Sequence, residues 1–112
     1  ARSKGSTMHI EVSTDNSIDG SETLITLIKG LVHQDLKYLE DHITRIEVHL
    51  SDASTGKSGP KRMHCMLEAR LSGDRPTVVK DAAETIEQAT KGAASKMKHA
   101  LETTLGKLSD HH

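Results

Sequence analysis

The chain has 112 residues, a length typical of one domain, with 15 basic and 16 acidic residues and a single aromatic side chain, Tyr38. This balance excludes a strongly basic nucleic-acid-binding composition for the chain as a whole. The single cysteine excludes an internal disulfide and suits a reducing compartment, and no apolar run approaches the ~18 residues of a membrane-spanning helix. Since a signal-peptide pattern is also absent, we expect a cytoplasmic protein with no membrane partner.

The charge is distributed unevenly along the chain. We interpret residues 1–7, which precede a methionine and lack apolar periodicity, as an expression remnant, and residues 8–112 as a single domain. Residues 8–56 hold nine acidic and three basic residues, whereas residues 57–75 hold two acidic and five basic, and residues 91–107 one acidic and four basic. This asymmetry indicates an anionic partner for the second half, although an unevenly charged solvated surface gives the same pattern.

The first half of the domain predicts a strand followed by a helix. Residues 8–14 alternate between apolar and polar side chains, which indicates a half-buried strand. A turn-forming segment follows, in which Asp19 or Ser21 can cap a helix. From Leu24, apolar residues recur at i, i+3, i+4 and i+7, and this spacing predicts an amphipathic helix that continues roughly to Leu39.

Two further strands are predicted in the middle of the chain. In residues 42–52, HITRIEVHLSD, the apolar Ile46, Val48 and Leu50 alternate with Arg45, Glu47 and His49. The preceding strand and helix imply a crossover, so the first two strands are expected to be parallel. A polar loop at residues 53–61 leads into a third alternating segment, residues 62–72, and the direct succession of two strands predicts a hairpin.

The last part predicts a short strand and a long helix. A turn at residues 73–76 precedes a fourth strand at residues 77–80, and from about Ala82 the apolar period returns to that of a helix. We therefore predict an α+β fold of order β-α-β-β-β-α, a four-stranded sheet with two helices packed on one face and the other face open. The apolar stripe of the last helix consists of Ile86, Ala89, Ala93, Met97, Ala100, Leu101 and Leu108.

Two short motifs invite a catalytic or nucleotide-binding interpretation. The GKS at residues 56–58 resembles part of a phosphate-binding loop, but that loop needs a glycine where Ser51 stands and joins a strand to a helix. Here it is expected to join two strands. His64 and Cys65 could suggest an activated thiol, yet neighbours on a strand point to opposite faces, so Cys65 is interpreted as a small core residue.

Three histidines lie on the polar side of their strands. If the strands are adjacent, His9, His49 and His64 could converge on a metal, but no HxH or HxxxH pair supplies two ligands locally. Solvated histidines are the favoured interpretation, and a histidine metal site is kept as an alternative. No pair of carboxylates is spaced for acid–base catalysis. We predict no enzyme activity, no cofactor and no small-molecule substrate.

Basic residues are the remaining candidates for function. Lys and Arg suit phosphate contacts, and the lack of stacking aromatics argues against a platform for single-stranded bases. A binder of structured RNA that recognises shape and phosphates fits this composition. The candidates cluster around the third strand at Lys57, Lys61, Arg62, Arg70 and Arg75, and along the last helix at Lys91, Lys96, Lys98, His99 and Lys107.

Three segments carry a resemblance to a known family. ITRIEVHLSD, KRMHCMLEARLSG and AASKMKHALETTLGKL resemble the ribosome hibernation promoting factor family, also called ribosome-associated inhibitor A or sigma-54 modulation protein, from Met8 to about Leu108. The resemblance implies a β-α-β-β-β-α fold similar to double-stranded RNA-binding domains. It also implies binding to the small ribosomal subunit in the channel for messenger and transfer RNA, which silences ribosomes in stationary phase or stress. The chain looks like the short type, without a dimerisation domain.

The resemblance transfers part of the family's basic ladder to the last helix. Lys96, Lys98, His99 and Lys107 fall on or near it, whereas Thr103, Leu105 and Asp35 stand where basic residues are common. EQATK, residues 87–91, replaces an aromatic-rich segment. We predict a monomeric or weakly dimeric translation inhibitor bound to ribosomal RNA; the alternative is a divergent paralogue that binds a protein through its open sheet face. The predicted RNA contacts are Arg62, Arg70, Lys91, Lys96, Lys98, His99 and Lys107.

Overall fold

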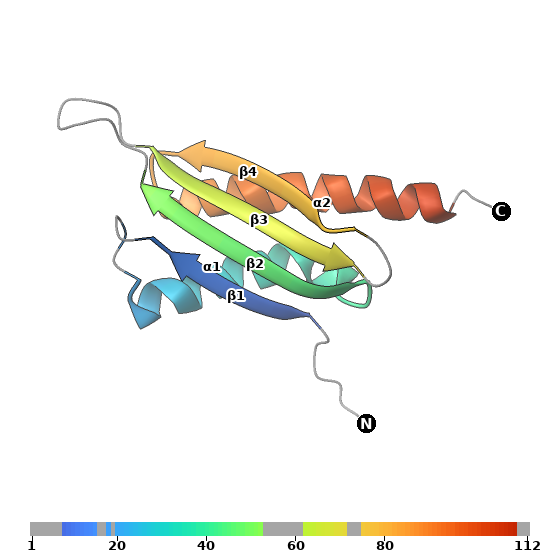
Figure 1. The fold of residues 1–112 in the computed structure, drawn as a ribbon, viewed down its shortest axis with the longest axis horizontal. Helices are drawn as coiled ribbons and strands as arrows, with labels where there is room; N and C mark the ends of the chain where they lie inside the picture. Colours follow the sequence, from blue (N-terminus) through green and yellow to red (C-terminus); the bar gives the residue numbers. More distant parts are fainter. Residues whose placement is uncertain (1–7, 16–17, 19, 53–61, 72–74, 110–112) are drawn as a thin grey trace, which may run out of the picture.

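Four strands and two long helices form the structure, a computed structural model that describes residues 8–15, 18, 20–52, 62–71 and 75–109. The strands make one sheet in the order β1-β2-β3-β4, with β1 parallel to β2 and the other pairs antiparallel. This confirms the predicted α+β fold of order β-α-β-β-β-α (Figure 1). The elements are β1 (His9–Thr14), α1 (Glu22–Leu36), the 3-10 helix η1 (Lys37–Leu39), β2 (Ile43–Asp52), β3 (Met63–Leu71), β4 (Thr77–Ala83) and α2 (Ile86–Ser109).

Both helices lie on the same face of the sheet, as the sequence predicts. Figure 1 shows α1 behind β1 and β2, and α2 behind β3 and β4. Helix α1 contacts β1, α2 contacts β3 and β4, and the two helices also contact each other. The opposite face of the sheet, called the open face below, is not covered by either helix.

The core lies between the sheet and the helices and is aliphatic. Strand register aligns the inward residues in rows, such as Val12, Val48, Leu67 and Val79 across all four strands. Helix α1 contributes Ile28, Val32 and Leu36, all fully buried. On α2 the buried side chains are mostly small, which lets this helix approach the sheet closely: Ala89, Ala93, Ala94, Met97 and Leu101.

The first helix begins and ends with recognisable local chemistry. The Ser21 hydroxyl accepts a hydrogen bond from the Leu24 backbone N–H at 3.2 Å, so Ser21 is the N-cap; the other candidate, Asp19, lies outside the described residues. The α-helix ends at Leu36, and the predicted continuation to Leu39 is the tighter helical turn η1. The sequence therefore predicted the extent of this segment but not its change of geometry.

The boundary between β4 and α2 differs from the prediction. A helix was expected from about Ala82, but β4 extends to Ala83 and α2 begins at Ile86. Ala82 pairs with His64 of β3, and this ladder outweighs the helix propensity of alanine. The helix is instead started by Thr85, whose hydroxyl accepts a hydrogen bond from the Gln88 N–H at 3.1 Å.

A register shift between Ile43 and Arg45 explains the irregular burial pattern at the start of β2. Ile43 and Ile46 are both buried although they are three residues apart, which a regular period of two does not allow. The predicted loop at residues 53–61, with its GKS motif, lies outside the described residues. Among the described residues, no helix is both long enough and apolar enough to cross a membrane.

Candidate functional site

The strands position the polar residues of the open face in rows that cross the sheet. Because side chains alternate along a strand, residues at every second position share a face, and register brings the faces of neighbouring strands together. One row contains three carboxylates, and the rows on either side contain mostly basic groups. The rows are His9, Arg45 and Arg70; Glu11, Glu47, Glu68 and Val78; and Ser13, His49, Met66 and Lys80.

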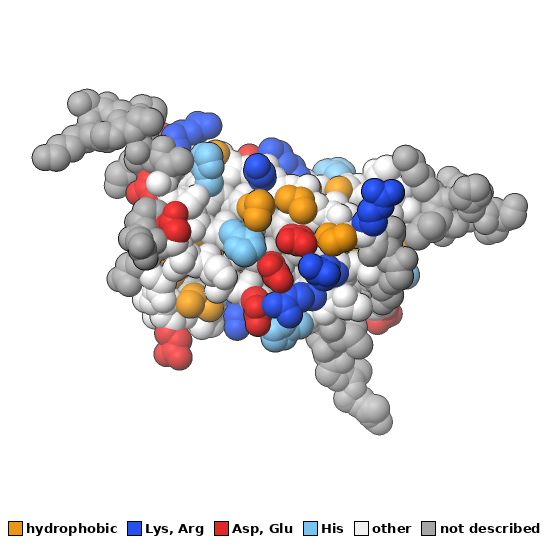
Figure 2. All heavy atoms as spheres, in the orientation of Figure 1, with side chains coloured by type: hydrophobic (Ala, Val, Ile, Leu, Met, Phe, Trp, Pro, Cys, Tyr) orange, Lys and Arg blue, Asp and Glu red, His pale blue; other side chains and the backbone are white. Residues whose placement is uncertain are grey.

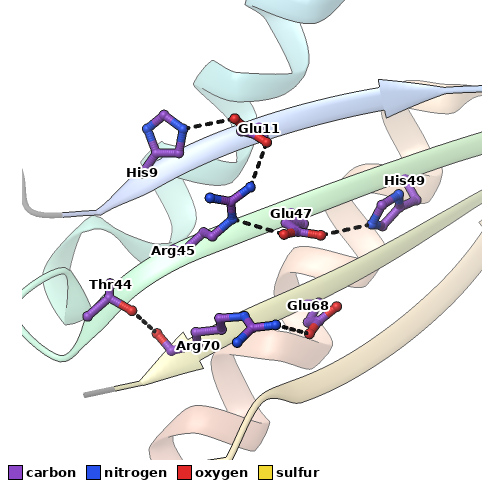
Figure 3. Close-up of polar contacts among 8 residues, drawn as sticks. All are labelled: His9, Glu11, Thr44, Arg45, Glu47, His49, Glu68 and Arg70. Carbon is purple, nitrogen blue, oxygen red and sulfur yellow. Dashed lines mark hydrogen bonds and ion pairs between the residues drawn. The ribbon is translucent and has the colours of Figure 1, made fainter. Parts of the chain in front are cut away.

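Arg45 is the centre of an ion-pair network on β1 and β2 (Figure 3). Its guanidinium donates to Glu11 at 2.7 Å and to Glu47 at 2.9 Å. His9 lies 3.2 Å from the second Glu11 oxygen, and His49 lies 3.4 Å from the second Glu47 oxygen. Both carboxylates are therefore bridged by Arg45 and each is flanked by an imidazole.

This network favours the ionised form of the Glu11 carboxyl. The hydrogen bond from His9, followed by the charge of Arg45, lowers the pKa of the Glu11 carboxyl below its ordinary value of 4.5. Figure 2 shows acidic, basic and hydrophobic side chains mixed over the open face. The solvent-exposed face of β2 therefore has balanced charges, and Arg45 is held there by ion pairs to both glutamates.

Arg62 and Arg70, both predicted RNA contacts, lie at opposite ends of β3. Eight residues of extended chain separate them by roughly 26 Å. Arg70 lies on the open face, 3.7 Å from a Glu68 oxygen (Figure 3), whereas Arg62 precedes β3 and lines a small hollow with His64 and Lys96. The two arginines therefore do not form one contact patch.

The predicted basic ladder of α2 divides between two sides of the helix. Lys96 reaches β4, where its ammonium donates to the Lys80 carbonyl at 2.8 Å and lies 3.3 Å from Asp81. Lys98, on the other side, lies 5.7 Å from the centre of the Tyr38 ring in η1. Lys91, two helical turns before Lys98, lines a groove between α1 and α2. His99 is exposed between these sides, and the Lys107 side chain lies outside the described part.

Tyr38 also joins η1 to α2 through its hydroxyl. The hydroxyl donates a hydrogen bond to Glu102, which raises the pKa of Tyr38 to about 12. This contact could not be predicted from the sequence, because residues 38 and 102 are far apart in the chain. Lys80 is not among the predicted contacts, although the alternation of β4 places this lysine on the open face beside Met66.

The structure separates His64 from Cys65 as predicted. Cys65 is fully buried under α2, and its burial is the main reason why the pKa of its thiol is raised to about 11. His64 is exposed on the open face. Within the described residues, no group of three or more His, Cys, Asp or Glu side chains is arranged to hold a metal, so the histidine metal site has no ligand set there.

The protein is a small α+β domain. It has a four-stranded mixed sheet with both helices on one face, and its second helix carries basic groups. The chain belongs to the family described as sigma 54 modulation protein / S30EA ribosomal protein, whose model matches residues 8–109. This confirms the family resemblance seen in the sequence. No protein with curated annotation is significantly similar in sequence.

Two solved structures are similar to this fold over most of its length. The N-terminal domain of Thermus thermophilus Protein Y superposes with a TM-score of 0.65 at 13% identity, covering 87% of this chain and 97% of that one. A ribosomal subunit interface protein from Coxiella burnetii gives a TM-score of 0.66 at 13% identity, with 88% and 97% covered. At such low identity, the likeness establishes the fold alone.

Proposed function

We propose that the protein binds the small ribosomal subunit in the channel used by messenger and transfer RNA, and inhibits translation by occupying it. Membership of the S30EA ribosomal protein family over residues 8–109 is the observation that carries this proposal. The description of the similar Coxiella burnetii protein as a ribosomal subunit interface protein supports it. In this role the protein would act in the cytoplasm, under stress or in stationary phase, without chemistry of its own.

The arrangement of charge on α2 supports an RNA contact there. Lys91 and Lys98 lie seven residues apart, so both ammonium groups project from the same side of the helix. Lys98 is half-buried beside Tyr38, and Lys91 is exposed at the groove with α1. Fixed cations spaced along a helix match the repeating phosphates of a structured RNA. The proposed contacts are Arg62, Arg70, Lys91, Lys96, Lys98, His99 and Lys107.

Arg70 and Lys96 are among the proposed contacts that would have to exchange a partner on binding. Arg70 would leave Glu68, and Lys96 would leave Asp81 and the Lys80 carbonyl. Lys91 and Lys98 have no such ion pair among the described residues, so substitutions there test RNA binding without releasing an internal carboxylate. They are therefore better probes than Lys96.

The test is co-sedimentation with purified small subunits over a range of salt concentrations. We expect the Lys91→Gln/Lys98→Gln variant to bind about tenfold more weakly or worse, and the slope of log affinity against log salt to fall by about 2, one for each lost phosphate contact. Toeprinting of messenger RNA on the same subunits measures whether binding occludes the channel.

A charge-matched control comes from the first helix. The Lys29→Gln/Lys37→Gln variant removes the same charge from exposed positions of α1 and η1. It should keep the wild-type salt slope. Equal losses in both variants would show that only net charge matters, and unchanged binding of the α2 variant would reject α2 as the RNA contact.

The mixed surface of the open face favours a second candidate function, binding of a protein partner. Met66 and the half-exposed Val78 place apolar side chains on this face, and methionine is enriched at protein interfaces. A partner captured from stationary-phase lysate whose binding is insensitive to salt and is lost on Val78→Glu would support this function over ribosome binding.

A further inference from the structure

One end of the open face contains a hollow that the ribosome-binding proposal does not use. It has a volume of about 430 Å³ and lies where β1 and β2 end and β3 begins. Strand register sets its geometry: Met66 lies between His49 on β2 and Lys80 on β4, and Ser51 lies opposite His64. The residues that line the hollow from the open face include Ser13, His49, Ser51, His64, Met66 and Lys80.

The polar groups around this hollow are those that bind phosphate. Lys80 supplies a fixed positive charge, His64 a ring N–H and Ser51 a hydroxyl. A second, smaller hollow shares His64 and Lys80 and adds Arg62 and Lys96 on its other side. Four basic side chains, including His64 and Lys80 themselves, therefore line this second hollow together with the Asp81 carboxylate.

Among the described residues, the nearby carboxylates pair with groups other than the Lys80 ammonium. Asp81 lies 3.3 Å from Lys96, and Glu47 lies 2.9 Å from Arg45 and 3.4 Å from His49. Asp15 lines the hollow at the β1 end, on the other side of β2 from Lys80. Lys80 is therefore the cation available to an anionic ligand in this hollow, with the exposed His64 beside it.

An apolar surface lies beside this charged end. The Met66 side chain lines the hollow, and Figure 2 shows hydrophobic side chains next to histidine and basic side chains in this part of the open face. A flexible thioether can pack against the flat ring of any nucleotide base. The volume falls within the range of pockets that hold small ligands, about 300–1,000 Å³.

We propose that this hollow is a nucleotide-binding site, with the phosphate held by His64 and Lys80 and the base packed on Met66 beside His49. The shared chemistry is a phosphate ester next to a planar base, and it can come from a free mononucleotide or from one nucleotide of an RNA chain. The site is separate from Lys91 and Lys98, which lie beside α1 and η1 on the other side of the sheet, whereas Arg62 and Lys96 of the proposed ribosome contact line the adjoining hollow.

The test is an NMR titration of the full chain without ribosomes, using guanosine 5′-monophosphate, guanosine and inorganic phosphate as probes. The mononucleotide should shift the Met66 methyl and the His49 and His64 ring signals, with an affinity about tenfold above that of guanosine or phosphate alone. Lys80→Gln should weaken it about tenfold. Lys29→Gln, an equal loss of charge on α1, should leave it unchanged.

Three results would overturn the proposal: no shifts up to about 10 mM mononucleotide, equal affinity for guanosine and its monophosphate, or equal weakening by Lys80→Gln and Lys29→Gln. A short single-stranded RNA distinguishes the two sources. Tighter binding of the RNA with the same shifted residues assigns the site to RNA, and equal binding assigns it to a free nucleotide. Either result supports the site, and neither depends on whether ribosomes bind.

Discussion

The two faces of the sheet are built from the same strands but depend on different interactions. The inward row of Val12, Val48, Leu67 and Val79 packs under the helices, and the central two of these residues are fully buried. The outward row beside it, Glu11, Glu47, Glu68 and Val78, is in contact with solvent. Burial of apolar surface dominates on the inner face, whereas exposed charges contribute little net stability. The open face can therefore change its chemistry without loss of the fold.

The same substitution made on each face is the strongest test of this contrast. Val48→Thr puts a hydroxyl into a site with 0% exposure, where it has no solvent partner. We expect it to lower the free energy of unfolding by about 1–3 kcal/mol, because a buried polar group without a hydrogen bond is unfavourable. Urea denaturation followed by circular dichroism measures the change.

Val78→Thr is the matched control on the open face. Val78 is 50% exposed, so its new hydroxyl remains in water, and threonine keeps the β-branched shape that suits a strand. The change in unfolding free energy should stay within about 0.5 kcal/mol. Similar losses at both positions would show that the open face is covered in solution, for example by a second copy of the chain.

A smaller effect is expected where the inner face meets α2 at Gly92. A Cβ on this residue would overlap the Asp81 carboxylate, which lies directly under the helix. We expect Gly92→Ala to destabilise the protein by about 1 kcal/mol, since the strain of overpacking, about 1–3 kcal/mol, exceeds the helix propensity gained, about 1 kcal/mol. The Asp81→Ala/Gly92→Ala double variant should be more stable than the sum of the single changes predicts.

Gly30 provides the control for this substitution. It lies inside α1, and a Cβ there would meet nothing within 4 Å. Gly30→Ala should therefore stabilise the protein by up to about 1 kcal/mol through helix propensity alone. If Gly92→Ala were stabilising to the same degree, close approach of α2 to β4 would not be the reason for glycine at position 92.

Most of the fold could be predicted from local patterns. The alternation in β1, β2 and β3 and the helical period from Leu24 are properties of short segments, so the element order followed from them. The end of β4 could not, because Ala82 and Ala83 are good helix formers and only their pairing with β3 keeps them in a strand. At these two residues, pairing with β3 had a larger effect on the backbone conformation than local helix propensity.

Less of the candidate site could be predicted, because a contact depends on side-chain direction in three dimensions. The family resemblance placed Lys96 and Lys98 on one ladder, but the structure directs Lys96 to the edge of β4 and Lys98 to Tyr38. The assignment of all seven predicted residues to RNA stays a prediction. Lys80 shows the converse: its alternation in β4 was visible in the sequence, but its convergence with His64 needed the strand register.

The smallest expected effect concerns Arg45, the cation between two registered carboxylates. Arg45→Gln removes the charge that, after the His9 hydrogen bond, lowers the pKa of Glu11. The pKa of Glu11 should therefore rise towards 4.5. A carboxyl whose pKa is lowered on folding stabilises the protein at pH values above its ordinary pKa. This stability is lost as the pH falls through the folded-state pKa. The variant should accordingly lose less stability than the wild type between neutral and acid pH.

NMR titration of the Glu11 carboxyl carbon separates this local effect from a general change of charge. Arg70→Gln removes a guanidinium from the same open face, but one that lies 3.7 Å from Glu68 on β3, two strands away from β1. It should leave the Glu11 pKa unchanged, because charges on an exposed surface are screened over such a distance. An equal rise of the Glu11 pKa in both variants would mean that this pKa depends on the total charge of the open face and not on particular ion pairs. A rise with Arg45→Gln alone would show that its ion pairs are fixed contacts between β1 and β2.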